Sequence, residues 1–273
     1  MKDLYSLSLI QIQQLINKKE ILYTMSCSNE QREITIEDLK NTPRYELYRK
    51  MSAMLKGSPK PGRYVEFLPT VFSTVLASRE KNPIIMFEAI IDKLRKLWNI
   101  SPGMPVSGPW HHAVVPGVLI ASLRNNGYPF TDEDVEEALK RGALVPAAAC
   151  GFLGACGAAV GLGVAVSVIT KATPYHDKER SLALKYSAEA NTLVARHGGP
   201  HCCRLASYLV ILHAVKVFEK EFGYKLPTPS SKELIGRCTL WEENPVCHME
   251  RCMFNPLVRK LAEERKKTNT AGS

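Results

Sequence analysis

Residues 142–170 read GALVPAAACGFLGACGAAVGLGVAVSVIT and carry no charged side chain between Arg141 and Lys171. This window is long enough to cross a bilayer as a helix. However, its glycines and alanines make it only weakly hydrophobic, and Pro146 interrupts its first part. Small residues let helix backbones approach closely. We therefore expect no membrane span but a central helix that is packed on all sides inside a helical domain.

The sequence on both sides of this window is predicted to be helical. Apolar side chains recur at helical spacing, and Thr131 before three acidic residues is a good N-cap signal. Strand pairs joined by hairpin turns and glycine-rich nucleotide-binding motifs are not found in the sequence. Helices are expected over residues 4–19, 42–55, 64–78, 84–98, 112–125, 131–141, 178–196 and 203–222, with a short helix near 232–235 and a final polar helix.

The predicted fold class is all-α. We expect a multi-helix globular domain around a central apolar Gly/Ala-rich helix, followed by an irregular C-terminal Cys-rich hook. The Pro/Gly-rich residues 101–109 are the best candidate for a boundary. The expected parts are an N-terminal helical segment (1–105), a Cys-rich helical core domain (106–256) and a polar C-terminal helix or tail (257–273).

Composition narrows the classes of partner. The chain has 273 residues, of which 45% are hydrophobic, and a formal net charge of +9. The basic excess lies at the two ends without interleaved aromatic residues, so a small-molecule substrate is favoured over nucleic acid. A homo-oligomer is compatible with this composition. Residues 1–20 lack the apolar run of a secretory signal. We therefore expect a cytoplasmic protein, whose cysteines bind metal or react rather than form disulfides.

Seven of the eight cysteines lie in the second half of the chain, in three groups. Thiolates are preferred ligands of zinc and of iron–sulfur clusters, whereas an isolated free cysteine is often simply buried. Two groups and a triple favour metal binding, so we expect them to converge on one site. The candidate metal ligands are Cys150 and Cys156, then Cys202 and Cys203, and then Cys238, Cys247 and Cys252.

The three groups are expected to contribute unequally. Cys150 lies where a loop becomes the apolar helix, and the helix N-terminus would stabilise its thiolate. Cys156 lies six residues further on and is as readily a packed thiol as a ligand. Cys202 and Cys203 follow a Gly-Gly-Pro turn. Because adjacent side chains point apart, only one of this pair is expected to bind the metal.

The hook, CTLWEENPVCHMERC at residues 238–252, gives the strongest metal signal. It is polar and short of apolar anchors, so a bound metal would supply its order. Zinc commonly uses a Cys-x-x-Cys spacing, which the hook lacks. An iron–sulfur cluster accepts more scattered ligands, so the hook favours a cluster.

Histidines and arginines near the cysteines are candidates for catalysis. Histidines after a Gly-Pro turn are candidate general bases, those beside the cysteine pair could move a proton, and arginines could bind a substrate carboxylate. Helix capping and surface ion pairs are the ordinary alternatives. The candidates are His111 and His112 as bases, His197 and His201 as proton carriers, and Arg196 and Arg204 as carboxylate ligands.

Residues 108–256 resemble an uncharacterised family known as domain of unknown function 5714. The resemblance rests on four segments: GPWHHAVVP (108–116), VPAAACGFLGACGAAVG (145–161), HGGPHCC (197–203) and the hook. Members of that family carry a Cys-rich, zinc-ribbon-like front segment. This chain departs from that pattern, because only Cys27 lies in its first 149 residues.

The region from Cys150 to Cys203 is similar, more faintly, to the catalytic domains of iron–sulfur L-serine dehydratases and cysteine desulfidases. That resemblance implies an all-helical domain in which three cysteines hold a [4Fe-4S] cluster and one iron stays open as a Lewis acid. This chain departs from the pattern by a longer loop around Lys171–Arg180 and by its cysteine pair.

Three functions follow as hypotheses. The leading one is a [4Fe-4S] enzyme that catalyses elimination or sulfur removal on a small substrate, with the cluster held by Cys150, by Cys202 or Cys203, and by the hook. The second is a zinc-stabilised helical binding module that docks a partner through its N-terminal residues. The third is a sulfur relay to RNA, with a persulfide on Cys202 or Cys203.

Overall fold

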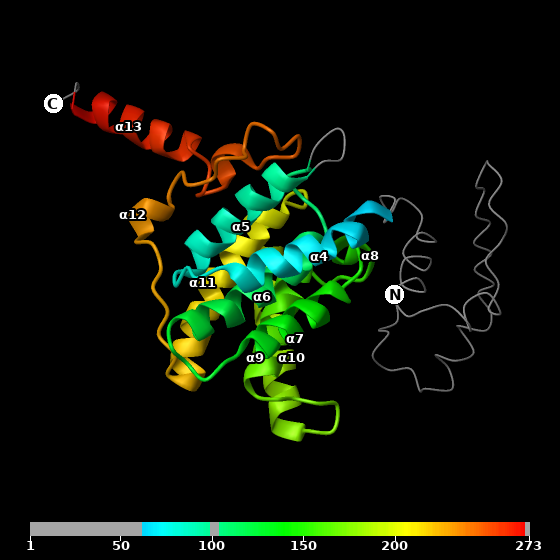
Figure 1. Cartoon of the computed structure of the whole chain (residues 1–273). Helices are drawn as coiled ribbons and strands as arrows, with labels where there is room; N and C mark the ends of the chain where they lie inside the picture. Colours follow the sequence, from blue (N-terminus) through cyan, green and yellow to red (C-terminus); the bar gives the residue numbers. More distant parts are fainter. Residues whose placement is uncertain (1–61, 99–103, 271–273) are drawn as a thin grey trace, which may run out of the picture. The chain divides into compact units, whose positions relative to one another are not determined.

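The computed structural model describes residues 62–98 and 104–270, and within these ranges it contains only helices, turns and loops (Figure 1). This confirms the predicted all-α class. The predicted helices at 4–19 and 42–55 lie outside the described residues. The elements are α4 (Gly62–Ala77), α5 (Pro83–Leu97), α6 (Trp110–Asn125), α7 (Asp132–Ala143), α8 (Ala149–Phe152), α9 (Gly157–Ile169), α10 (Asp177–His197), α11 (Cys203–Phe222), α12 (Ser231–Leu234), the 3₁₀ turn η2 (Met249–Arg251) and α13 (Leu257–Thr270).

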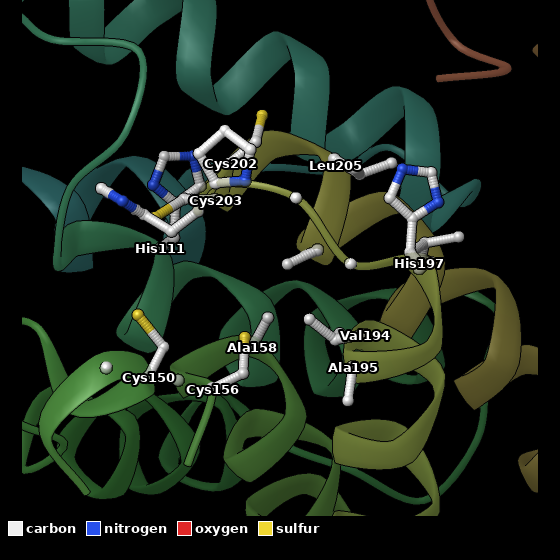
Figure 2. A pocket seen from close by; sticks show the side chains of 18 of the residues that line it. His111, Cys150, Cys156, Ala158, Val194, Ala195, His197, Cys202, Cys203 and Leu205 are labelled. Atoms are coloured by element: carbon white, nitrogen blue, oxygen red, sulfur yellow. The ribbon is translucent and has the colours of Figure 1, made fainter. Parts of the chain in front are cut away.

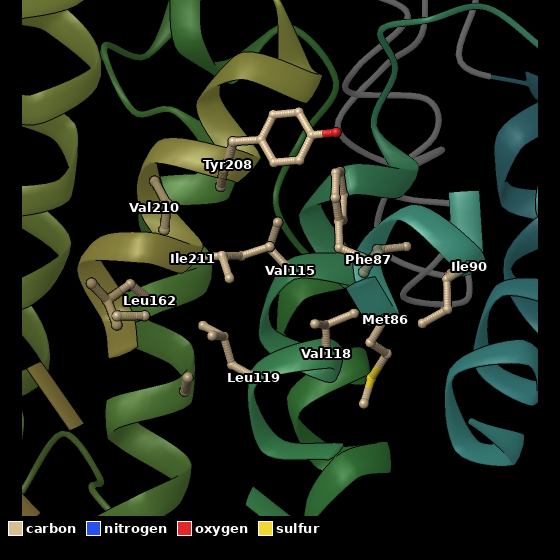
Figure 3. Close-up of a cluster of buried hydrophobic side chains, with 14 of the residues drawn as sticks. Met86, Phe87, Ile90, Val115, Val118, Leu119, Leu162, Tyr208, Val210 and Ile211 are labelled. Carbon is tan, nitrogen blue, oxygen red and sulfur yellow. The ribbon is translucent and has the colours of Figure 1, made fainter. Parts of the chain in front are cut away.

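Helix α6 forms the centre of the hydrophobic core. Every residue from Trp110 to Leu123 is buried, and the helix contacts α4, α5, α7, α9 and α11. Figure 3 shows Val115, Val118 and Leu119 of α6 among side chains from α5, α9 and α11. The central position expected for the uncharged window is therefore shared between α9 and α6. Helices α4 and α5, from the predicted N-terminal segment, belong to the same core.

The uncharged window does not form one continuous helix, which corrects the expectation for Cys150. Its first part forms the short helix α8 and a turn in which Gly154 has a φ of +67°. This left-handed backbone, which favours glycine, separates α8 from α9. Helix α9 has Cys156 as its N-cap residue, so the apolar helix begins after Cys156 and not at Cys150. Among the described residues, no helix is both long and apolar enough to cross a membrane.

Glycines set the distances between the central helices. A Cβ atom on Gly142 of α7 would lie 2.3 Å from the carbonyl oxygen of His112 in α6. On the outer side of α9, a Cβ atom on Gly163 would lie 2.8 Å from the Cβ of Ser187 in α10. Both distances are far below a van der Waals contact. The small residues of the window therefore allow close helix packing, as the sequence predicts.

The hook is irregular, as predicted, and hydrogen bonds fix it against the helices. The N–H of Cys238 donates to the carbonyl oxygen of Phe254 at 2.6 Å, which joins its two ends. Arg237, just before the hook, donates to both carboxylate oxygens of Glu88 in α5 at 2.7 Å. The hydroxyl of Tyr208 in α11 donates to the same carboxylate at 2.8 Å. The hook is thus held at α5 and α11.

The Gly142→Ala variant is expected to be less stable than the wild type by about 1–3 kcal/mol, the usual cost of overpacking a core. The new methyl group would meet a backbone carbonyl oxygen, which no change of rotamer can move. Gly151→Ala is the matched control, because a Cβ atom there meets nothing within 4 Å. Urea denaturation measures both free energies of unfolding. Equal stabilities would show that α6 and α7 can separate without cost.

Candidate functional site

Two adjoining cavities bring the three cysteine groups together. The larger has a volume of about 380 Å³ and is lined by Cys150 and Cys156 and by Cys202 and Cys203. Figure 2 shows these two pairs on opposite sides of the cavity. The smaller cavity is lined by Cys202 and by all three cysteines of the hook. The cysteines therefore form two groups, one around each cavity. The two groups are neighbours because Cys202 borders both cavities.

Four thiols surround the smaller cavity: Cys202, Cys238, Cys247 and Cys252. Burial raises the pKa of Cys202 and of Cys238, and it raises the pKa of Cys252 to about 11. The other three thiols raise the pKa of Cys252 further, because thiolates at this distance repel one another. A cation among them would therefore stabilise all four thiolates. In residues 62–98 and 104–270, no three His, Cys, Asp or Glu side chains stand at the spacing for a single metal ion.

Hydrogen-bond donors point at the sulfur atoms of the smaller cavity. The Nδ2 of Asn244 donates to the Sγ of Cys202 at 3.5 Å, and the Nδ2 of Asn255 donates to the Sγ of Cys247 at 3.3 Å. The backbone N–H of Met249 also donates to the Sγ of Cys247 at 3.5 Å. Both asparagines are buried. Hydrogen bonds thus hold the sulfur atoms of both cysteines in place.

Arg204 places a positive charge beside these thiols. Its side chain is only 2% exposed, and its guanidinium lies over the rings of Phe87 and Tyr208, 5.9 and 5.4 Å from their centroids. Burial raises the pKa of Cys238, whereas the charge of Arg204 and a hydrogen bond from it lower that pKa. The Nε and Nη1 atoms of Arg204 are buried without a partner.

The structure places the two arginines predicted to bind a carboxylate in different surroundings, and that role stays a prediction. Arg204 lines only the smaller cavity, where Phe87 and Tyr208 hold it beside the thiols. Arg196 is exposed and lines neither cavity. His201 is exposed and lines the larger cavity, so its predicted role in proton transfer there stays a prediction.

The larger cavity holds two histidines whose tautomers are fixed by backbone carbonyl groups. The Nδ1 of His111 lies 3.0 Å from the carbonyl oxygen of Gly108, and the Nδ1 of His112 lies 3.0 Å from that of Val145. A carbonyl oxygen only accepts, so each Nδ1 carries the hydrogen and each Nε2 is an acceptor. Burial lowers the pKa of His111 to about 3. A general base works best when its pKa lies near the working pH, so burial disfavours His111 in this role; the base role of His111 or His112 stays a prediction.

The start of α9 lies directly against the ring of His112. A Cβ atom on Gly157 would lie 2.0 Å from the Cδ2 of His112, so this approach requires glycine. Burial raises the pKa of the neighbouring Cys156, and hydrogen bonds from backbone N–H groups at the start of α9 offset this only in part. The N–H groups at the start of this helix thus act on the thiol of Cys156, where burial outweighs them. Cys150 itself is exposed.

The adjacent cysteines Cys202 and Cys203 divide between the two cavities. Burial raises the pKa of Cys203 to about 12, and its backbone N–H donates to the Oγ of Ser107 at 3.2 Å. Cys203 lines only the larger cavity. The sulfur of Cys202 accepts instead from Asn244 of the hook, and Figure 2 shows it directed away from Cys150 and Cys156. One thiol of the pair thus belongs with the hook.

His248 joins the hook to the Gly-Gly-Pro turn. Its Nε2–H donates to the carbonyl oxygen of Pro200 at 2.6 Å, and its ring stacks on that of His197 with a centroid distance of 5.1 Å. A Cβ atom on Gly199, whose φ is +79°, would lie 2.7 Å from the Cε1 of His248. His248 lines both cavities. Three residues at the site were not singled out from the sequence, although each lies within or next to the hook: Asn244, His248 and Asn255.

The protein is expected to lose stability as the pH falls below 6.5, the pKa of His111 in the unfolded chain. The native state keeps this histidine neutral, so below that pH the unfolded state binds a proton that the native state excludes. The free energy of unfolding should then fall with a slope approaching about 1.4 kcal/mol per pH unit. The His111→Asn variant should lack this part of the slope. Chemical denaturation at pH 6.5 and about two units lower tests this, and equal slopes would contradict it.

The family comparison matches most of the described helices. A model described as Family of unknown function (DUF5714) matches residues 71–255. This range contains all the residues that line the two cavities. No curated protein and no solved structure gives a significant match. Because the family model matches residues 71–255, more than half of the chain, the chain belongs to this family of unknown function.

Proposed function

We propose that this protein is an iron–sulfur enzyme that acts on a small molecule. A cluster would be held by Cys202, Cys238, Cys247 and Cys252 in the smaller cavity, and the substrate would bind in the larger one. The observation that carries the proposal is the meeting of four thiols from two separate segments around one small space. Isolated buried cysteines have no reason to gather in this way.

The surroundings of the four thiols also support a cluster. Reduction potentials of iron–sulfur clusters are set partly by hydrogen bonds to sulfur and by nearby charge. Asn244 and Asn255 supply such bonds, and the buried guanidinium of Arg204 supplies a charge opposite to that of the thiolates. The orphaned Nε and Nη1 atoms of Arg204 lack an acceptor, and an anionic centre would provide one.

The fourth thiol bears on the chemistry that a cluster would supply. The fainter family resemblance implies three ligands and an open iron, but Cys202 adds a fourth thiol to the three of the hook. Asn244 holds its sulfur toward the smaller cavity. We therefore propose full coordination, in which the bound cluster supplies a one-electron centre behind the wall of the substrate cavity. Elimination at an open iron would require Cys202 to be no ligand.

Anaerobically purified protein is expected to be brown, to absorb broadly near ~400 nm as thiolate-bound iron does, and to contain iron and acid-labile sulfide. The Cys202→Ser variant should lose most of its iron, because one of four ligands is gone. Cys203→Ser is the matched control, since the next thiol along lines only the larger cavity. Iron and sulfide per protein, with electron paramagnetic resonance, measure the difference.

The same measurements separate the alternatives. Colourless protein with stoichiometric zinc would reject the iron–sulfur centre and support the zinc-stabilised binding module. Full iron content in Cys202→Ser would remove Cys202 from the ligand set and restore the open-iron mechanism. Equal loss of iron from both variants, with unchanged helix content, would contradict the division of the two thiols between the cavities.

The Arg204→Met variant is expected to shift the reduction potential of the cluster to more negative values. Reduction adds an electron, and the buried positive charge that favours it would be gone. The shift should be on the order of 50–100 mV, which corresponds to about 1–2 kcal/mol between charges in a protein. Arg251→Met is the control, because this hook arginine is exposed and screened by water. Redox titration measures all three potentials, and identical values would contradict a role of Arg204 beside the cluster.

A further inference from the structure

Three thiols of the larger cavity have no part in the proposed cluster. Cys150, Cys156 and Cys203 line this cavity and not the smaller one, and all three are free cysteines. Among the described residues that line the larger cavity, none is an aspartate, glutamate, lysine or arginine. Its wall therefore offers a bound molecule sulfur nucleophiles, but no carboxylate, ammonium or guanidinium group.

The turn between α8 and α9 brings Cys150 and Cys156 close to each other. The backbone N–H of Ala155 donates to the carbonyl oxygen of Ala149 at 3.3 Å, so the residues that precede the two cysteines are in direct contact. The chain reverses at Gly154, whose φ is +67°. Figure 2 shows both cysteine side chains on the same side of the larger cavity. The two thiols thus form a pair within one short segment.

Asn191 of α10 fixes this turn. Its Oδ1 accepts the backbone N–H of Cys156 at 2.9 Å, and its Nδ2 donates to the carbonyl oxygen of Gly154 at 3.3 Å. Both bonds go to the backbone, so they set the position of the pair without occupying its sulfur atoms. Groups that are positioned in this way react with each other far more readily than the same groups free in solution.

The two thiols differ in access and in their response to each other. Cys150 is exposed, whereas Cys156 is partly buried. Burial raises the pKa of Cys156, backbone N–H groups at the start of α9 lower it, and the charge of Cys150 raises it. Once Cys150 is bonded to another sulfur atom it carries no charge, so Cys156 then ionises more easily. An accessible first thiol beside a second one that is activated by reaction of the first suits thiol–disulfide exchange.

We propose that the larger cavity is a thiol–disulfide exchange site for small uncharged disulfides, with Cys150 as the attacking thiol and Cys156 as the resolving thiol. The inference rests on the proposed function in taking this cavity as the substrate site, and it names the class of substrate. The volume of about 380 Å³ is within the range of pockets for small molecules. A charged disulfide would leave water without gaining a counter-charge, which is costly.

The exchange takes place in two steps. The thiolate of Cys150 bonds to one sulfur atom of the substrate, the S–S bond of the substrate breaks, and the first half leaves and takes up a proton. The thiolate of Cys156 then attacks the sulfur of Cys150 and releases the second half, which also takes up a proton. The two protons are those that the protein thiols gave up. The protein dithiol is oxidised to a disulfide, and the substrate is reduced to two thiols.

One tryptic peptide reports on this pair alone, because residues 142–171 contain Cys150 and Cys156 and no other cysteine. The anaerobically prepared full chain is treated with bis(2-hydroxyethyl) disulfide, quenched with acid, alkylated and digested for mass spectrometry. The wild-type peptide should become lighter by two hydrogen atoms. In Cys156→Ser it should instead keep one mercaptoethanol half on Cys150. In Cys150→Ser its reaction should be at least roughly tenfold slower, since the remaining thiol is less accessible.

Two outcomes of this experiment would overturn the roles of the two thiols. One is a mixed disulfide on Cys150 that persists in the wild type as long as in Cys156→Ser. The other is a bond from Cys150 to Cys203, which would be detected as a link between two tryptic peptides.

A second disulfide of similar size, 3,3′-dithiodipropionate, tests the class of substrate because it carries two carboxylates. Each rate is divided by the rate of the same disulfide with N-acetylcysteine amide, a free thiol. The uncharged disulfide should then react roughly tenfold faster than the charged one, and equal ratios would overturn the uncharged class. Iron is measured in the same samples. Exchange in iron-free protein would reject the cluster and support this site, whereas iron-loaded protein without exchange would overturn this site and leave the cluster in place.

Discussion

The arrangement of the helices depends on how tightly the chain closes around His112. Gly142 of α7 meets its carbonyl oxygen, Gly157 at the start of α9 meets its ring, and the carbonyl oxygen of Val145 accepts its Nδ1–H. One residue of α6 is thereby enclosed by two helices and by the loop between α7 and α8. The same contact places the start of α9, and with it Cys156, in the wall of the larger cavity.

Local signals were sufficient to predict most of the described helices. Helix α7 begins where Thr131 caps it, with the side chains of Thr131 and Asp134 each bonded to the backbone of the other. Helix α11 spans the predicted residues 203–222. The break in the uncharged window was not predicted, because Gly154 in an apolar run suits close helix packing as well as a turn. Only the folded chain shows that its backbone is left-handed.

The composition of each cavity could not be predicted, because it depends on contacts between distant segments. The sequence predicts that the cysteine groups lie near one another, but not which thiol lines which cavity. Which thiol of the pair Cys202 and Cys203 faces the hook depends on Asn244, some forty residues further along the chain. The acceptor character of His112 likewise depends on Val145, which lies 33 residues away. Spacing along a sequence carries no information about such partners.

The position of the four thiols along the chain has a thermodynamic consequence. Cys202 is the N-cap residue of α11, whereas the last thiol of the smaller cavity, Cys252, lies about fifty residues later. A centre bound to both would close a long loop and so reduce the conformational entropy of the unfolded polypeptide. If it acts like a covalent cross-link, this would raise the free energy of unfolding by about 4 kcal/mol. Such a centre would then stabilise the fold of residues 202–252 as well as supply a reactive group.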